Sequence, residues 1–275
     1  MRKKDALNKL DSYKQNLIRK ELSKSTIERY LYDICQCLDK MPEFIEKENL
    51  ITYKEDIKKI YQLGTLNNKI IAINSFLNYL ELNELKLKTS KKVYGLDEEN
   101  VISKQEYNKL LNYCISTKRY KMYYIIRTLA NTGIRVSELK FVKVEYVKNG
   151  YVKVFNKGKE RKIYFSPKLQ KLIIEFCNLK RINNGIIFRG ADGISSISRF
   201  TINSNLKLLA KKCNIKKEKL HAHSFRHLFA KEFLKVEKNI FELAKILGHK
   251  SVDTTMIYSN MTYEEKRDSL NKLDL

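Results

Sequence analysis

The chain has 275 residues, 43% of them apolar, and its 55 Lys and Arg against 31 Asp and Glu give a net charge of +24. That length and apolar content suffice for one large or two modest buried cores, while the excess positive charge favours a polyanionic partner and salt-sensitive binding. Five cysteines without a C-x-x-C pair argue against a disulfide framework or a thiol redox motif, and no apolar run approaches the ~20 residues of a membrane span.

The start of the chain bears on where the protein works. The first residues, MRKKDALNKLDSYK, lack the apolar stretch of a signal peptide. Cysteines that form no disulfide framework are typical of a reducing compartment. We therefore expect a cytoplasmic protein with no membrane partner.

Residues 1–88 are predicted to form a small helical domain. Apolar residues recur there at helical spacing in two stretches, Ile27–Leu38 and Leu66–Leu80. Residues 89–102 are charged and lose this periodicity, which indicates a linker. A second domain is then expected over residues 103–275.

The second domain opens with a helix start and contains a hairpin signal. In SKQE, the Ser103 hydroxyl can accept a hydrogen bond from the backbone N–H of Glu106, and the Glu106 carboxylate can accept one from the backbone N–H of Ser103. This capping box precedes the apolar residues Leu110 and Leu111 and predicts the start of a helix. Between residues 151 and 165, apolar and charged residues alternate on both sides of NKGK, which predicts a β-hairpin. The expected fold class is mainly α, with a small antiparallel β-hairpin or sheet in the second domain.

Six residues of this domain together have the side chains that a chemical reaction at a phosphate requires. They are Arg135 in TGIRVSEL, Lys157 in NKGKER, His223 and Arg226 in HSFRH, His249 in LGHKS and Tyr258 in DTTMIYSN. Breaking a DNA phosphodiester without a metal needs cations beside the non-bridging oxygens, a nucleophile, and a proton donor for the leaving oxygen. The set supplies residue types for each of these tasks.

The two arginines suit phosphate binding, because a guanidinium donates two parallel hydrogen bonds to one phosphate and stays charged. Arg135 follows Gly133, which permits a tight turn, and Glu138 lies one turn further along and can orient it. On a helix, His223 and Arg226 share one face and present it to a phosphate, opposite a stripe of phenylalanines.

The remaining residues are expected at turns or on a short helix. The apolar run before Gly248 stops at that glycine, a favourable left-handed cap, so His249 projects from the turn beyond it. Tyr258 follows DTT, a helix start signal, and is expected on another short helix. Lys157 lies in the hairpin turn, where a mobile ammonium can protonate a leaving oxygen, and Lys159 competes with it for this task.

As a set, the six residues resemble the tyrosine recombinase (phage integrase) family in order and spacing, from about residue 100 to the C-terminus. The chain is similar to the compact Xer-like and mobile-element members. The resemblance implies that Tyr258 attacks the scissile phosphate to form a 3′-phosphotyrosyl enzyme, while Arg135, Arg226 and His249 stabilise the transition state. It also implies that Lys157 is the general acid, that His223 assists proton transfer, and that neither ATP, a metal nor another cofactor takes part.

The resemblance further implies partners and a quaternary arrangement. Residues 1–88 would be a core-binding domain that clamps double-stranded DNA together with the catalytic domain. The recombinase would act as a homo-tetramer, or as a hetero-tetramer with a related recombinase, with residues 259–275 docking on a neighbouring protomer. An accessory protein is a further partner, and integration or excision of a mobile element and resolution of DNA dimers both remain open as biological roles.

Other interpretations of the same residues stay open. A non-catalytic DNA-binding regulator or architectural protein on this fold would share the basic charge, and a type IB topoisomerase would share the chemistry without strand exchange. Cys213, His221, His223 and His227 are zinc ligands by type, but no second cysteine completes a known spacing. We interpret His221 and His227 as structural histidines outside the site, and Tyr263 as the alternative nucleophile.

Overall fold

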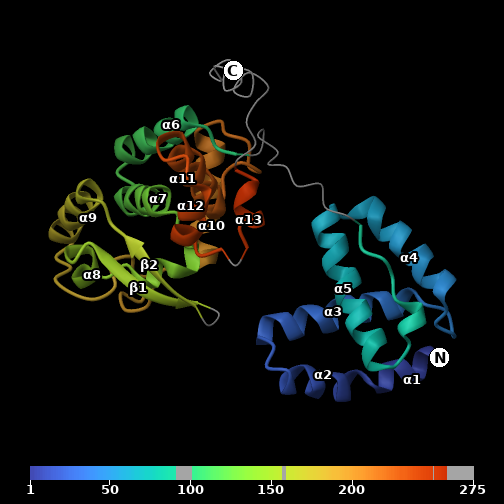
Figure 1. Cartoon of the computed structure of the whole chain (residues 1–275). Helices are drawn as coiled ribbons and strands as arrows, with labels where there is room; N and C mark the ends of the chain where they lie inside the picture. The colour runs from blue at the N-terminus through green and yellow to red at the C-terminus, as the bar shows by residue number, and fades with distance from the viewer. Residues whose placement is uncertain (91–100, 157–158, 250, 259–275) are drawn as a thin grey trace, which may run out of the picture. The chain divides into compact units, whose positions relative to one another are not determined.

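The computed structural model describes residues 1–90, 101–156, 159–249 and 251–258. The chain divides into two compact units, Met1–Val93 and Tyr94–Leu275, each with its own core (Figure 1). Within the described residues, every helix is too short or too polar to cross a membrane. All five cysteines are free.

The described part of the first unit, residues 1–90, is built of helices. Its elements are α1 (Lys3–Asn8), α2 (Leu10–Arg19), α3 (Lys24–Lys40), α4 (Lys47–Ile60), α5 (Leu63–Tyr79) and the 3-10 helix η1 (Asn83–Leu85). Both predicted helical stretches are confirmed, because they lie on α3 and α5, which pack against each other. Ser23 caps the start of α3, because its hydroxyl accepts a hydrogen bond from the backbone N–H of Thr26 at 3.3 Å.

The side chains of two asparagines on helix α5 form hydrogen bonds with the backbone of the segment after η1. Asn74 hydrogen bonds to both the N–H and the C=O of Leu87, each at 2.8 Å. Two helical turns earlier, Asn67 does the same to Ser90, at 3.0 and 2.8 Å. Of the expected linker, residues 91–100 lie outside the described residues. Its far end, Ile102, is buried in the core of the second unit.

A buried ion pair joins α3 to α5. The Lys69 ammonium donates to the Asp33 carboxylate and to the Gln36 side-chain oxygen, each at 2.7 Å. Lys69 and Asp33 are only 4% and 5% exposed, so each charge depends on the other for its stabilisation. The ammonium also lies 4.8 Å from the centre of the Tyr61 ring.

The second unit is mainly helical with one hairpin, as the sequence predicts. Its elements are α6 (Lys104–Ser116), α7 (Tyr120–Thr132), η3 (Val136–Phe141), α8 (Val144–Lys148), β1 (Tyr151–Asn156), β2 (Lys159–Tyr164), α9 (Pro167–Leu179), α10 (Arg199–Lys212), α11 (Ala222–Val236), α12 (Ile240–Leu247) and α13 (Asp253–Met256). Helix α7 packs against α6, α9 and α11 and so lies at the centre of the unit (Figure 1).

The predicted start of α6 and the predicted hairpin are both confirmed. Ser103 and Glu106 form a capping box, with bonds of 3.1 and 2.8 Å between side chains and backbone. Strands β1 and β2 pair antiparallel, with Val152 opposite Ile163. Both of these side chains are buried, whereas alternate residues face outward. Strand β2 packs on α12, which brings the hairpin to the candidate site.

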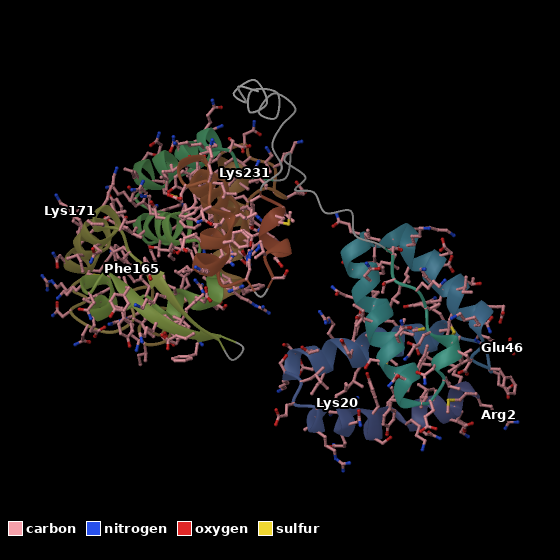
Figure 2. All side chains as sticks on the ribbon, viewed as in Figure 1. Arg2, Lys20, Glu46, Phe165, Lys171 and Lys231 are labelled. Carbon is pink, nitrogen blue, oxygen red and sulfur yellow. The ribbon has the colours of Figure 1, made fainter. Side chains whose placement is uncertain are left out.

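Charged side chains cover the surface of both units (Figure 2). Lys20 in the first unit and Lys171 in the second are exposed, whereas Phe165 is buried at the end of the hairpin. The high net charge of +24 is therefore carried largely by solvated lysines. Such a surface suits contact with a polyanion.

Replacing Lys69 with methionine tests the buried ion pair. Lys69→Met leaves the Asp33 carboxylate buried without its counter-charge, so we expect the free energy of unfolding of the first unit to fall by about 3–5 kcal/mol. Urea denaturation followed by circular dichroism measures the loss. In the control Lys58→Met, the lysine belongs to an exposed pair with Glu55, and the loss should stay below about 1 kcal/mol. Equal small losses in both variants would contradict the account.

Candidate active site

A buried glutamate organises the first part of the site. Helix α7 ends at Gly133, which has φ 62°, and the chain turns there into Arg135 and η3. The Glu138 carboxylate accepts the backbone N–H of Arg135 at 2.7 Å and lies 3.5 Å from its guanidinium. The contact expected between these two residues is therefore present. The Arg135 side chain is 34% exposed and faces a cavity.

Arg161 on β2 is a second cation bound to the same glutamate, and no motif in the sequence predicts it. Its guanidinium donates to Glu138 at 2.5 Å and to the carbonyl of Ile246 at 2.6 Å. The aliphatic part of Arg161 packs under Gly248, where an added Cβ would lie 2.4 Å from Arg161 Cδ. The arginine thus ties the hairpin to the C-terminal end of α12.

Arg226 joins the ends of two helices. Its Nη1 donates to the carbonyl of Gly133 and its Nη2 to the carbonyl of Leu247, both at 2.7 Å. The side chain is 1% exposed, so the prediction that it lies with His223 on an exposed helix face is wrong for Arg226. The reason is tertiary, because the ends of α7 and α12 cover that position. His223 itself keeps an exposed edge.

The three guanidinium groups carry more positive charge than their surroundings neutralise. Burial, followed by the charges of Arg135 and Arg161, lowers the pKa of Arg226 to about 9, so the group stays charged at neutral pH. Burial also lowers the pKa of Arg161. Arg135, Arg161 and Arg226 share one glutamate, Glu138, which leaves this cluster with two excess positive charges. The Nε atoms of Arg161 and Arg226 are buried without a hydrogen-bond partner, and an anion would satisfy such a cluster.

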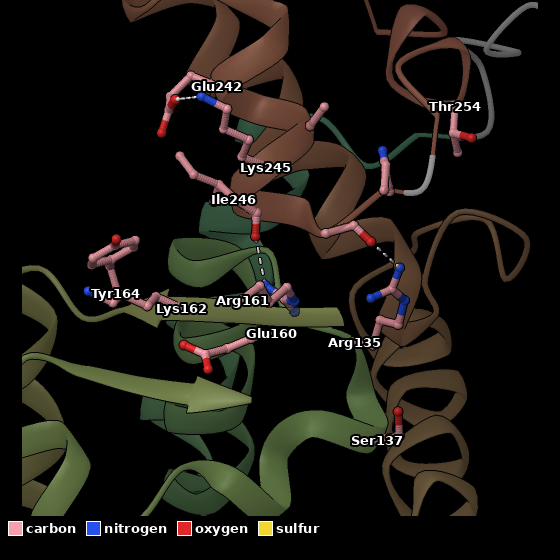
Figure 3. A pocket seen from close by; sticks show the side chains of 13 residues that line it. Arg135, Ser137, Glu160, Arg161, Lys162, Tyr164, Glu242, Lys245, Ile246 and Thr254 are labelled. Carbon is pink, nitrogen blue, oxygen red and sulfur yellow. Dashed lines mark hydrogen bonds and ion pairs between the residues drawn. The ribbon is translucent and has the colours of Figure 1, made fainter. Parts of the chain in front are cut away.

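A cavity of about 830 Å³ opens beside this cluster. Figure 3 shows Arg135, which precedes η3, and Arg161 on β2 beside the cavity, each bonded to the backbone at the end of α12. The lining is mostly basic and polar: Arg135, Ser137, Glu160, Arg161, Lys162, Tyr164, Glu242, Ala244, Lys245, Ile246, Gly248, His249 and Thr254. The cavity is therefore suited to a charged ligand of negative sign.

His249 lies on the wall of this cavity, as its position after a glycine cap predicts. Helix α12 ends at Gly248 with φ 64°, which confirms the predicted left-handed cap. The His249 Nδ1 atom lies 2.6 Å from the Thr255 hydroxyl, so its orientation is fixed by α13. Burial and the charge of Arg226 lower the pKa of His249 to about 4.

Tyr258 is placed differently from the prediction. Helix α13 ends at Met256, and Tyr258 lies in the turn that follows rather than on the helix. Its side chain is 8% exposed, and its hydroxyl lies 2.8 Å from the Nδ1 atom of His227. Burial raises the pKa of Tyr258 from its ordinary value, so the phenol is protonated at neutral pH.

His227 was assigned to the structural histidines, yet it is the residue that touches the tyrosine hydroxyl. The rings of His223 and His227 pack nearly perpendicular to each other, with 4.7 Å between centres and an angle of 87°. The contact between the two histidine rings could have been predicted, since positions 223 and 227 are four apart and share a helix face. The contact of His227 with Tyr258 has no such signal in the sequence. The pKa of both histidines is lowered to about 4, chiefly because surrounding protein displaces water from the rings.

Several expected participants lie outside what the structure describes. Lys157, the expected general acid, is one of them, and so are Tyr263 and the whole segment 259–275. The side chain of Lys159, the competitor for the role of general acid, is not described either. Among the described residues, no group of three His, Cys, Asp or Glu side chains is arranged to hold a metal ion.

Comparisons with known proteins show which proteins this chain resembles. A model of the phage integrase family matches residues 100–265. A tyrosine recombinase from Pseudothermotoga lettingae is 30% identical over 275 residues, covering 92% of this chain and 93% of the relative. The Tn1549 transposon integrase in complex with transposon right end DNA is 17% identical, with a TM-score of 0.76 and 100% of both chains covered. A lambda integrase tetramer bound to a Holliday junction has a TM-score of 0.75 at 14% identity, covering 93% of this chain and 78% of that chain. The expected fold class is confirmed.

Replacing Glu138 tests the charge cluster. Glu138→Gln keeps the size of the side chain but leaves the buried Arg161 and its neighbours without their counter-charge, so we expect the free energy of unfolding to fall by about 3–5 kcal/mol. Urea denaturation of the full chain measures this. The control is Glu242→Gln, which alters an exposed pair with Lys245 on the same cavity and should change the stability by less than about 1 kcal/mol. A Glu138→Gln protein as stable as this control would show that the cluster does not need its carboxylate.

Proposed function

The chain belongs to the phage integrase family of tyrosine recombinases, and we propose that it cuts and rejoins double-stranded DNA at specific sites through a covalent bond to Tyr258. The observation that carries this proposal is the cluster of three arginines around one buried glutamate, in the same unit as a buried tyrosine hydroxyl. A phosphodiester brings the negative charge that this cluster lacks.

The proposed phosphate ligands are Arg135, Arg226 and His249. Arg135 faces the cavity, and Arg226 has a buried Nε–H without a partner. If the Thr255 hydroxyl donates to Nδ1 of His249, the proton of this imidazole resides on Nε2, which can then donate to a phosphate oxygen. Donors held in place before the reaction stabilise the extra charge of the transition state without further reorganisation.

The proposed reaction conserves the number of phosphoester bonds. The Tyr258 oxygen forms a bond to phosphorus and the bond to the 5′ oxygen breaks, with Lys157 proposed to protonate the leaving oxygen. His223 is proposed to assist proton transfer within the site. In the second step the 5′ hydroxyl of another duplex attacks the phosphotyrosine and releases Tyr258. Because one ester replaces another, the reaction requires no ATP.

The proposed partner is a pair of DNA recombination sites bound by four protomers. The net charge of +24 supports extensive phosphate contact, and the lambda integrase of the same fold was captured as a tetramer on a Holliday junction. Residues 1–88 are proposed to bind the core of the site, and residues 259–275 to join neighbouring protomers. The tetramer is either one of identical chains or one shared with a related recombinase. Excision or integration of a mobile element and resolution of DNA dimers are the two biological roles for this activity.

Removal of the Tyr258 hydroxyl tests the nucleophile. The protein is mixed with supercoiled DNA carrying its native flanking sequence, in EDTA, and the reaction is quenched with detergent. We expect wild type to yield a protein–DNA adduct that peptide mass maps to Tyr258, and Tyr258→Phe to yield none while its DNA affinity stays nearly unchanged. Tyr151→Phe, which alters an exposed tyrosine of the same unit, should still form the adduct. An adduct in Tyr258→Phe would move the nucleophile to another residue, first of all Tyr263.

Replacing Arg226 with lysine tests the guanidinium fork. A single ammonium cannot bridge the Gly133 and Leu247 carbonyls and also reach a phosphate, so we expect adduct formation to slow by about 100-fold or more. The matched control is Arg189→Lys, because Arg189 also holds two backbone carbonyls but lies outside the cavity lining. Near-normal cleavage by Arg226→Lys would show that the reaction does not need a guanidinium at this position.

A further inference from the structure

We propose that the Nδ1 atom of His227 takes the proton of the Tyr258 hydroxyl when that oxygen attacks the scissile phosphate. This inference rests on the proposed function, because it names the proton acceptor of the same cleavage step. The resemblance of the chain to its family points to His223 for proton transfer, and nothing in the sequence selects His227. The evidence for His227 is the position of its ring in the structure.

The geometry connects His227 directly to a reacting atom. Its Nδ1 lies 2.8 Å from the Tyr258 oxygen, and the two ring centres are 5.4 Å apart. Tyr258 is 8% exposed, so water has little access to compete for this proton. The His223 ring packs against the His227 ring instead, nearly perpendicular to it. In this arrangement His223 acts through His227, as a positioning residue.

The proton and the electrons balance in each direction. In cleavage, the Tyr258 O–H bond breaks as the O–P bond forms, and the proton passes to Nδ1 of a neutral His227 whose Nε2 already carries a hydrogen. The electron pair of the P–O5′ bond leaves with the 5′ oxygen, which the separate general acid protonates. In rejoining, the imidazolium of His227 returns its proton to the departing Tyr258 oxygen.

The surrounding charges make this transfer dependent on bound DNA. Burial lowers the pKa of His227 to about 4, and the groups facing it, His223, His221, Arg226 and His249, contribute to that lowering. The imidazole is thus neutral and able to accept at neutral pH. A phosphodiester bound at Arg226 offsets the positive charge that opposes protonation of His227. Burial also raises the pKa of the Tyr258 phenol, so the nucleophile keeps its proton until His227 accepts it.

The test measures single-turnover adduct formation on a duplex nicked beside the cleavage position, so that the cut end diffuses away. His227→Asn retains a hydrogen-bond partner for the tyrosine but cannot take its proton. We expect the adduct to form about 100-fold more slowly or worse, with DNA affinity unchanged. His227→Gln serves as a second variant with the same expected loss, and His221→Asn, which alters an exposed neighbour, should react as wild type does.

Two chemical substitutions separate proton acceptance from other roles. A fluorinated tyrosine at position 258 is a more acidic nucleophile, so it should recover part of the rate lost in His227→Asn. A bridging 5′-phosphorothiolate supplies a leaving group that needs no proton donor, and it should recover nothing. Recovery by the phosphorothiolate would place His227 on the leaving-group side and overturn the inference. Failure of the fluorinated tyrosine to recover any rate would reduce His227 to a structural role and overturn it equally.

Wild type provides the reference that separates the two proposals. If wild type forms no adduct with any DNA, the proposed function itself fails. If wild type forms the adduct and both His227 variants match its rate, the proposed function stands and the assignment of His227 is wrong.

Discussion

The site depends on one buried side chain, the guanidinium of Arg226, which holds the last carbonyls of α7 and α12 together at 2.7 Å each. Carbonyls at helix ends lack partners within their own helix, and here one arginine serves two of them. Arg135 and His249 each follow one of these carbonyls within two residues. Their separation is therefore set by Arg226, which makes this residue part of the framework as well as a proposed phosphate ligand.

Both helix ends require glycine for the same close packing. An added Cβ at Gly133 would lie 2.5 Å from a ring carbon of Phe229, and one at Gly248 would lie 2.4 Å from Arg161. The positive φ of both residues adds a second reason. The close approach leaves two guanidinium Nε atoms buried and unpaired, at a cost of about 1–3 kcal/mol for each unsatisfied donor. A phosphate that accepts from the Nε–H of Arg226, as proposed above, would relieve its share of that cost.

Local signals in the sequence predicted the elements, and tertiary contacts decided which residues meet. The capping box at Ser103, the hairpin around NKGK and the glycine cap before His249 depend on neighbouring residues, and each was predicted correctly. Arg161 was missed because one arginine among 55 basic residues carries no local signal. The burial of Arg226 and the contact of His227 with Tyr258 depend on where α12 and the turn after α13 fold back. Helical periodicity describes a single helix and does not determine such contacts.

A structure of the Tyr258→Phe protein bound to its own recombination site would test the central claim most directly. The account predicts that the scissile phosphate lies within hydrogen-bond distance of Arg135, Arg226 and His249, with the edge of the substituted ring at position 258 directed at phosphorus. A phosphate bound elsewhere on the second unit, with Glu138 as the only anion beside the three arginines, would contradict it.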